Sequence, residues 1–184
     1  LTADQIVSVA NTQVTGLITA GQTTGFGTVA TQNASAIAIT GGTAVGLSNL
    51  QVSGNITLSN AFFETANVQA AAVGANITLD AYSSGFSFYT SNATANTTVN
   101  LTGVNSLGSG ASTTFVLLQT NGATGYKVNT VQIEGTTANV TTKWLGGASP
   151  TSGNAANVDI YTFNVIKTNT ATYSVFASQS QYGG

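Results

Sequence analysis

The chain's 184 residues include three basic and five acidic side chains and no histidine, so 4% of residues are charged, against about 25% in ordinary domains. A net charge of −2 offers no basic field to nucleic acid or anionic lipid, and no apolar run approaches the roughly 18 residues of a membrane span. With no cysteine, disulfides are excluded. The sequence therefore predicts neither a nucleic-acid partner nor membrane insertion.

A short helix is predicted at the start of the chain. The stretch TADQ fits a capping box, with Thr2 as the N-cap and Gln5 three residues later. Leu1 and Ile6 occupy the positions of a hydrophobic staple, and the apolar spacing continues one helical face over residues 3–11. A helix this short does not hold in isolation.

From residue 12 to 60 the chain consists of short apolar–polar phrases broken by glycine, the longest being LQVSGNITLS at 50–59. This run alternates strictly, with uncharged polar residues on one side and Leu50, Val52, Ile56 and Leu58 on the other. A flexible Gly/Thr linker would not explain the alternation, and these residues offer no second long strand to complete a sheet. We therefore expect residues 1–60 to form a shaft in which three copies of the chain intertwine, with those four apolar side chains turned inward at the oligomer interface. Uncharged residues suit such an axis, because like charges held close together repel.

Residues 61–184 have the pattern of a separate globular head. Eight short segments alternate or are rich in β-branched and aromatic residues, and Gly, Asn and Ser turn signals separate them. Many short strands with no helical period between them are typical of an antiparallel β-sandwich, jelly-roll-like in form. The expected strands are 76–81, 85–90, 97–103, 113–120, 126–133, 138–145, 157–167 and 172–178. The chain as a whole is thus predicted to be all-β apart from the short N-terminal helix.

Two of these strands are apolar on both sides. FVLL at 115–118 has no polar parity, which indicates a central strand covered on both faces. In 157–167 the aromatic residues alternate with a second apolar set that includes Ile160 and Ile166. We expect this strand also to be covered on both sides, by a second sheet or by a neighbouring subunit.

The residue inventory offers little chemistry. Without His and Cys no Ser-His-Asp or Cys-His nucleophile is available, and the acids do not cluster at metal-ligand spacing, so no catalytic, cofactor-binding or metal site is predicted. Glu134 and Asp159 share the head and could in principle pair for glycoside cleavage, but isolated surface acids are the favoured interpretation. Trp144 is interpreted as a core or interface residue rather than a sugar-stacking one. Lys143 is a candidate ion-pair partner for either acid.

Three segments resemble a C-terminal domain of tail-fibre-like virion proteins of marine tailed bacteriophages, particularly those of cyanobacteria. They are YTSNATANTTVNLTG (89–103), VQIEGTTANVTTKWLGGASPTSGNAANVDIYTFNVIKT (131–168) and ATYSVFASQSQYG (171–183). The phrase ITGGTAVGLSNLQVSGNITLS (39–59) is similar to one that commonly precedes this domain, and ANTQVTGLIT (10–19) to repeats of fibre shafts.

The resemblance implies a homotrimeric fibre or spike on the virion surface, of tail or capsid, that contacts other virion proteins and a host surface glycan or protein. It carries no catalytic or receptor-binding residues over to this chain, and no enzyme activity is expected. Two alternatives stay open at this point. A bacterial cell-surface filament or adhesin subunit would have a similar composition, and a surface-glycan depolymerase would use the two acids of the head.

Overall fold

The structure is a computed structural model that describes residues 56–57 and 63–184. Contacts divide the chain into Leu1–Thr57 and Leu58–Gly184, and the description below concerns the second unit, called the head. The predicted helix at 3–11 and almost all of the predicted shaft lie outside the described residues.

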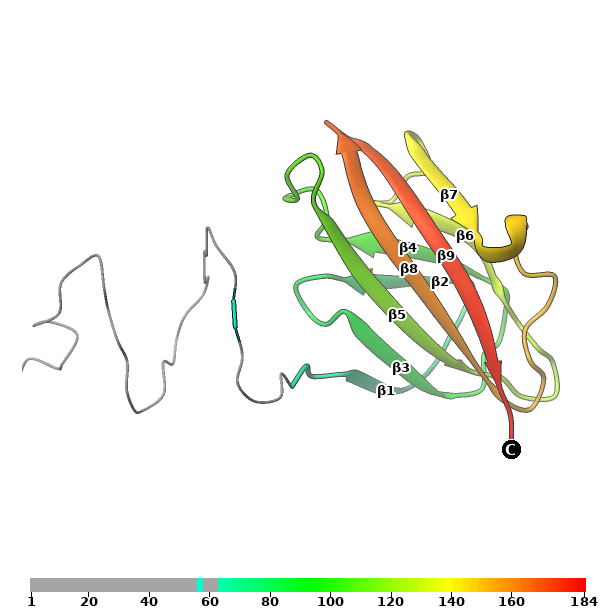
Figure 1. Cartoon of the computed structure of the whole chain (residues 1–184). Coiled ribbons are helices and arrows are strands. Elements are labelled where there is room, and N and C mark those ends of the chain that lie inside the picture. Colours follow the sequence, from blue (N-terminus) through cyan, green and yellow to red (C-terminus); the bar gives the residue numbers. More distant parts are fainter. Residues whose placement is uncertain (1–55, 58–62) are drawn as a thin grey trace, which may run out of the picture. The chain divides into compact units, whose positions relative to one another are not determined.

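Nine strands and one short 3-10 helix form the described head (Figure 1). They are β1 (Asn67–Ala72), β2 (Asn76–Asp80), β3 (Phe86–Ser91), β4 (Thr97–Thr102), β5 (Ser112–Thr120), β6 (Val128–Ile133), β7 (Val140–Trp144), η5 (Leu145–Gly147), β8 (Val158–Asn169) and β9 (Thr172–Tyr182). The all-β prediction for the head is confirmed over these residues. Each of the eight expected strands is present, and β1 is an additional strand.

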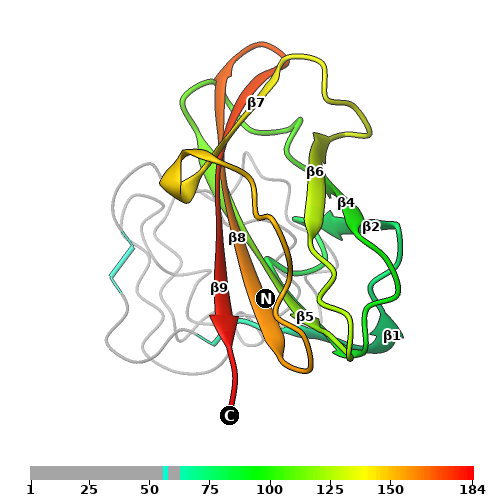
Figure 2. The same cartoon turned by 90° about the vertical axis from the view of Figure 1, so that its right-hand side faces the viewer.

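The strands form two sheets, and the chain alternates between them from β1 to β6. The six-stranded sheet has the order β1-β3-β5-β8-β9-β7, and the three-stranded sheet has the order β2-β4-β6. Figure 2 shows β2, β4 and β6 as a layer to one side of β8 and β9. From β2 to β5, each strand thus serves as the crossover between two strands of the other sheet, which gives short coils like those of a β-solenoid.

This alternation makes most strand pairings parallel, so the predicted antiparallel arrangement is wrong for them. β1–β3, β3–β5, β2–β4, β4–β6 and β7–β9 are parallel, and only β5–β8 and β8–β9 are antiparallel. Parallel neighbours need a crossover connection. A strand of the opposite sheet supplies it for the four parallel pairs among β1 to β6, and β8 of the same sheet supplies it between β7 and β9. Alternating side chains have the same period in both arrangements, so the sequence pattern did not distinguish them.

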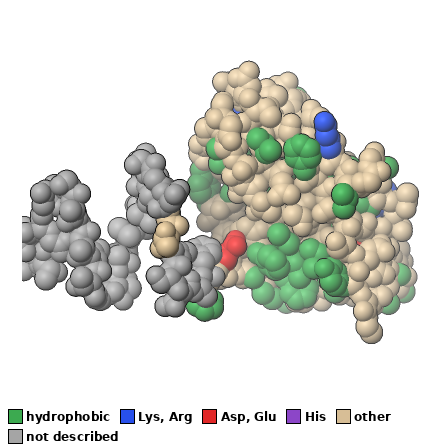
Figure 3. All heavy atoms as spheres, in the orientation of Figure 1, with side chains coloured by type: hydrophobic (Ala, Val, Ile, Leu, Met, Phe, Trp, Pro, Cys, Tyr) green, Lys and Arg blue, Asp and Glu red, His purple; other side chains and the backbone are tan. Residues whose placement is uncertain are grey.

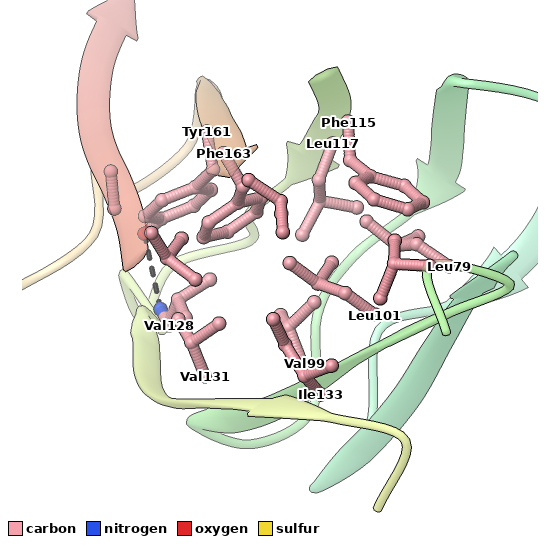
Figure 4. Close-up of a cluster of buried hydrophobic side chains, with 14 of the residues drawn as sticks. Leu79, Val99, Leu101, Phe115, Leu117, Val128, Val131, Ile133, Tyr161 and Phe163 are labelled. Atoms are coloured by element: carbon pink, nitrogen blue, oxygen red, sulfur yellow. Dashed lines mark hydrogen bonds between the residues drawn. The ribbon is translucent and has the colours of Figure 1, made fainter. Parts of the chain in front are cut away.

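The core lies between the two sheets, where aromatic residues of the larger sheet meet aliphatic residues of the smaller one. Figure 4 shows Tyr161, Phe163, Phe115 and Leu117 on one side, facing valine, leucine and isoleucine side chains of β2, β4 and β6. Phe163 is fully buried and its ring lies 6.4 Å from that of Tyr161 in a stacked arrangement. Removing these apolar side chains from water is the dominant favourable contribution to folding, and the aromatic ones bury the most area per residue.

Trp144 packs against this core as the sequence analysis predicted. Its ring meets Phe163 edge-to-face, with centroids 6.3 Å apart and an interplanar angle of 76°. Lys143, the preceding residue of β7, is exposed on the outer side of the six-stranded sheet, while Asp159 is fully buried on the inner side. The suggested Lys143–Asp159 ion pair is therefore excluded, because the sheet lies between the two side chains.

Candidate interaction surface

One side of the six-stranded sheet covers the core, and the other side carries a group of apolar side chains that no described element covers. Cross-strand register pairs Val68 with Phe88, Phe88 with Leu118, and Leu118 with Ile160, which makes a continuous row over four strands. A second row pairs Phe86 with Val116. We call these six residues the outer patch: Val68, Phe86, Phe88, Val116, Leu118 and Ile160.

The outer patch is visible as a cluster of hydrophobic side chains on the face that Figure 3 presents, over the position of β3 and β5 in Figure 1. Val68 is 63% exposed, and the other five residues are partly exposed. Most of its neighbours on the same face are uncharged hydroxyl and amide residues, and Ile166 and Phe176 lie further along β8 and β9. This polar rim comprises Thr114, Thr162, Asn164, Ser178 and Ser180, and the Thr114 hydroxyl donates a hydrogen bond to Asn164 Oδ1 at 2.8 Å.

Charged residues stay at the margins of this face. The outward positions of β1, β3, β5, β8 and β9 carry no lysine, aspartate or glutamate in the described structure. Lys143 lies on the edge strand β7, in register with Phe176 of β9. Glu64 precedes β1, and its carboxylate approaches Gly85 next to the start of β3.

The four interface residues predicted from the sequence belong to the predicted shaft. Leu50, Val52 and Leu58 lie outside the described residues, whereas Ile56 is described and is 61% exposed. The shaft interface thus stays a prediction. The outer patch was not named from the sequence, although the double apolar parity of FVLL and of residues 157–167 was its signal. Those patterns predicted that both sides of the two strands are covered. The three-stranded sheet covers one side, and no described element covers the other.

Glu134 and Asp159 are not brought together. Glu134 follows the last residue of β6, and its Oε1 accepts hydrogen bonds from the backbone amides of Val104 (3.1 Å) and Asn105 (3.2 Å). Asp159 lies beside the loop that leads into the other end of β6, and a six-residue strand spans about 20 Å. Paired carboxylates of glycosidases are roughly 5–9.5 Å apart, so these two acids cannot act as such a pair.

Asp159 belongs to a buried polar cluster, which corrects its interpretation as a surface acid. Asp159 and Gln119 are cross-strand partners at the end of β5 and the start of β8, and both are fully buried. Asp159 Oδ2 accepts hydrogen bonds from Asn121 Nδ2 at 2.8 Å and from the Asn154 amide at 2.9 Å. Gln119 Nε2 donates to Asn121 Oδ1 at 3.0 Å and to the Tyr126 carbonyl at 2.7 Å. The cluster therefore ties the loops after β5 and before β8 to the sheet.

Two acceptor atoms of this cluster have no donor. Asp159 Oδ1 and Gln119 Oε1 are both buried without a hydrogen-bond partner. Burial raises the pKa of the Asp159 carboxyl above its ordinary value, and the hydrogen bonds from Asn154, Gln179 and Asn121 offset only part of that effect. Burial, with the nearby Asp159 charge second, also raises the pKa of the Tyr161 hydroxyl. A proton on the Asp159 carboxyl would supply the missing donor.

Other site classes find little support within residues 56–57 and 63–184. That part of the chain contains no group of three or more His, Cys, Asp or Glu side chains placed to hold a metal ion. No helix in it is long and apolar enough to cross a membrane. Comparison of the chain with protein-family models, curated proteins and solved structures gave no match.

Proposed function

We propose that this chain is a structural protein of a phage virion, a homotrimeric fibre or spike of tail or capsid whose head contributes to host attachment. The observation that carries the proposal is that most charged side chains of the described head are buried or hydrogen-bonded to the backbone of the head itself. Asp159 is buried, and Lys127 Nζ donates to the Pro150 carbonyl at 2.6 Å. Lys167 Nζ likewise donates to the Asn105 carbonyl at 2.7 Å, and backbone amides occupy the Glu134 carboxylate.

A three-fold assembly explains why such a surface is useful. Residues near the axis of a homotrimer meet their own copies, so each charge there faces a like charge in a partly dry contact. Hydroxyl and amide side chains avoid this repulsion and still form hydrogen bonds, because a hydroxyl both donates and accepts. The resemblance of 89–183 to tail-fibre-like domains supports the same assembly independently.

The function follows from the copy number. A trimer presents three identical sets of head loops on one particle, and several trimers multiply that number. Linked weak contacts gain roughly 10²–10⁴ in overall avidity without any stronger individual contact. The proposed partners are therefore other virion proteins at the attached end and a host surface glycan or protein at the head.

The first test is the mass of the full chain in solution. Light scattering coupled to size exclusion, at micromolar concentration, should give three times the 18.4 kDa chain mass. A monodisperse monomer would refute the assembly. A bacterial filament subunit could also be trimeric, so antibodies against the head should be applied to phage particles and viewed by electron microscopy. Labelling of a particle appendage supports the virion proposal, whereas labelling confined to bacterial cells overturns it.

A further inference from the structure

We propose that the outer patch is the surface through which each head packs against a second copy of this chain. The inference rests on the proposed trimer and goes further, because it assigns the head's contact surface to the outer side of the six-stranded sheet. The shaft residues predicted from the sequence are a different set.

Strands β5 and β8 carry apolar residues on their uncovered side as well as on their buried side. Inside the head, Phe115, Leu117, Tyr161 and Phe163 are fully buried against the smaller sheet. Outside, the same two strands carry Val116, Leu118 and Ile160, where a one-sided antiparallel sheet normally carries polar residues. A contiguous apolar patch on the surface of a protein usually marks a site where another molecule binds.

The lack of charge around the outer patch indicates which partner covers it. An ordinary protein surface would place several charged side chains against the outer patch, and each would lose water without gaining a counter-ion. A copy of this chain carries 4% charged residues overall and none on the outward positions of β3, β5 and β8. The outer patch of a second copy is therefore a suitable partner for it, because neither surface buries an unpaired charge.

The polar rim also suits an identical partner. Threonine and serine hydroxyls both donate and accept, so a rim of them can form hydrogen bonds with an identical rim in many registers. A rim of Lys or Glu would have to meet the opposite charge, which an identical copy related by three-fold symmetry does not place there. The rim beside the outer patch consists of Thr114, Thr162, Asn164, Ser178 and Ser180.

These features suit three heads whose six-stranded sheets face a common axis. Packed sheets lie about 10 Å apart, so outward residues at the centre of the face approach their own copies across that distance. Thr162 is such a residue, in register with Val116 on one side and with Ser178 on the other. Thr78 is exposed on the outer side of the three-stranded sheet, in register with Asn100, and faces away.

The absence of native cysteine makes this arrangement directly testable in the full chain. Thr162→Cys and Thr78→Cys are the same substitution on opposite sides of the head, and each creates the only thiol of its variant. Each protein is treated with a bis-maleimide that spans about 10 Å, then boiled and run on a denaturing gel. We expect T162C to give covalent dimers, at least tenfold more than T78C, which should stay monomeric.

The two proposals fail in different ways. If the untreated chain is a trimer and T78C cross-links as well as T162C, or better, the outer patch is not the interface and the trimer stands. If the untreated chain is a monomer by light scattering and neither variant cross-links, the trimer itself is refuted. A variant that does not fold is recognised by its far-UV circular dichroism, and Ser178→Cys, on the adjacent strand of the same face, then replaces T162C in the comparison.

Discussion

Asp159→Asn should stabilise the head at neutral and alkaline pH, although it removes one of only five acidic residues. The asparagine carbonyl can accept the hydrogen bonds that Asn121 and Asn154 now donate to the carboxylate at 2.8 and 2.9 Å. Its amide nitrogen takes the place of Oδ1 and supplies the donor that the cross-strand partner Gln119 lacks. The variant therefore has the hydrogen-bonding pattern of the protonated carboxyl at every pH.

The sign of the pH dependence follows from the raised pKa of Asp159. At pH 3 the carboxyl is protonated in both the folded and the unfolded chain, so its ionisation costs nothing. As pH rises above the unfolded pKa the unfolded chain ionises first, and the folded chain loses stability until pH passes the folded pKa. A buried acceptor such as Gln119 Oε1 that is left without a donor costs about 1–3 kcal/mol, and this cost applies only while the Asp159 carboxyl is ionised.

The assay is urea denaturation of the full wild-type and D159N chains at pH 4, 6 and 8, followed by tryptophan fluorescence of Trp144. We expect the D159N advantage in unfolding free energy to grow from near zero at pH 4 to about 1–3 kcal/mol at pH 8. Asp80→Asn is the control, because Asp80 Oδ1 accepts only a local hydrogen bond from the Tyr82 amide. A D159N chain that is less stable than wild type at pH 8 would show that the site uses the negative charge, and the proton argument would be wrong.

Three further changes test the packing, each by urea denaturation against a matched control. Phe163→Ala should cost about 3–5 kcal/mol because the ring is fully buried, whereas Phe176→Ala, 46% exposed on the outer side, should cost less than about 1 kcal/mol. Tyr161→Phe removes the hydroxyl that accepts the first β6 amide at 3.3 Å, and should cost about 1–3 kcal/mol. Gly153→Ala would drive a Cβ into the backbone of the loop before β6 and should destabilise the head strongly, while Gly108→Ala, with open space around it, should not.

The strands were predictable from the sequence, but their partners were not. Segments such as NITLD and TTVNLT alternate clearly, and they form β2 and β4 within a residue of the expected ends. Alternation reports which side of a strand is buried and is silent about strand direction. The connections between β1 and β6 are short enough for hairpins, so a pattern of short strands and turns indicated antiparallel neighbours, although each connection leads to the opposite sheet.

β1 and the buried carboxyl were missed for different physical reasons. β1 has the sequence NVQAAA, in which three alanines remove both the alternation and the β-branched signal. Its strand conformation depends on pairing with β3, which is a tertiary contact. Asp159 shares the parity of Tyr161 and Phe163, but an aspartate is rarely fully buried, so the residue type indicated a surface position. Its burial depends on Asn121 and Asn154, which reach it from two separate loops.

The pattern of β5 and β8 links the fold to the proposed assembly. Both strands are apolar on both parities, and a sequence of that kind normally belongs to a strand covered on two sides. The alternation of β1 to β6 places β2, β4 and β6 over one side of the six-stranded sheet, so no strand of the described head covers the other side. The head's own core therefore does not explain why Leu118 and Ile160 are apolar. A second head packed on this side would cover them and would explain it.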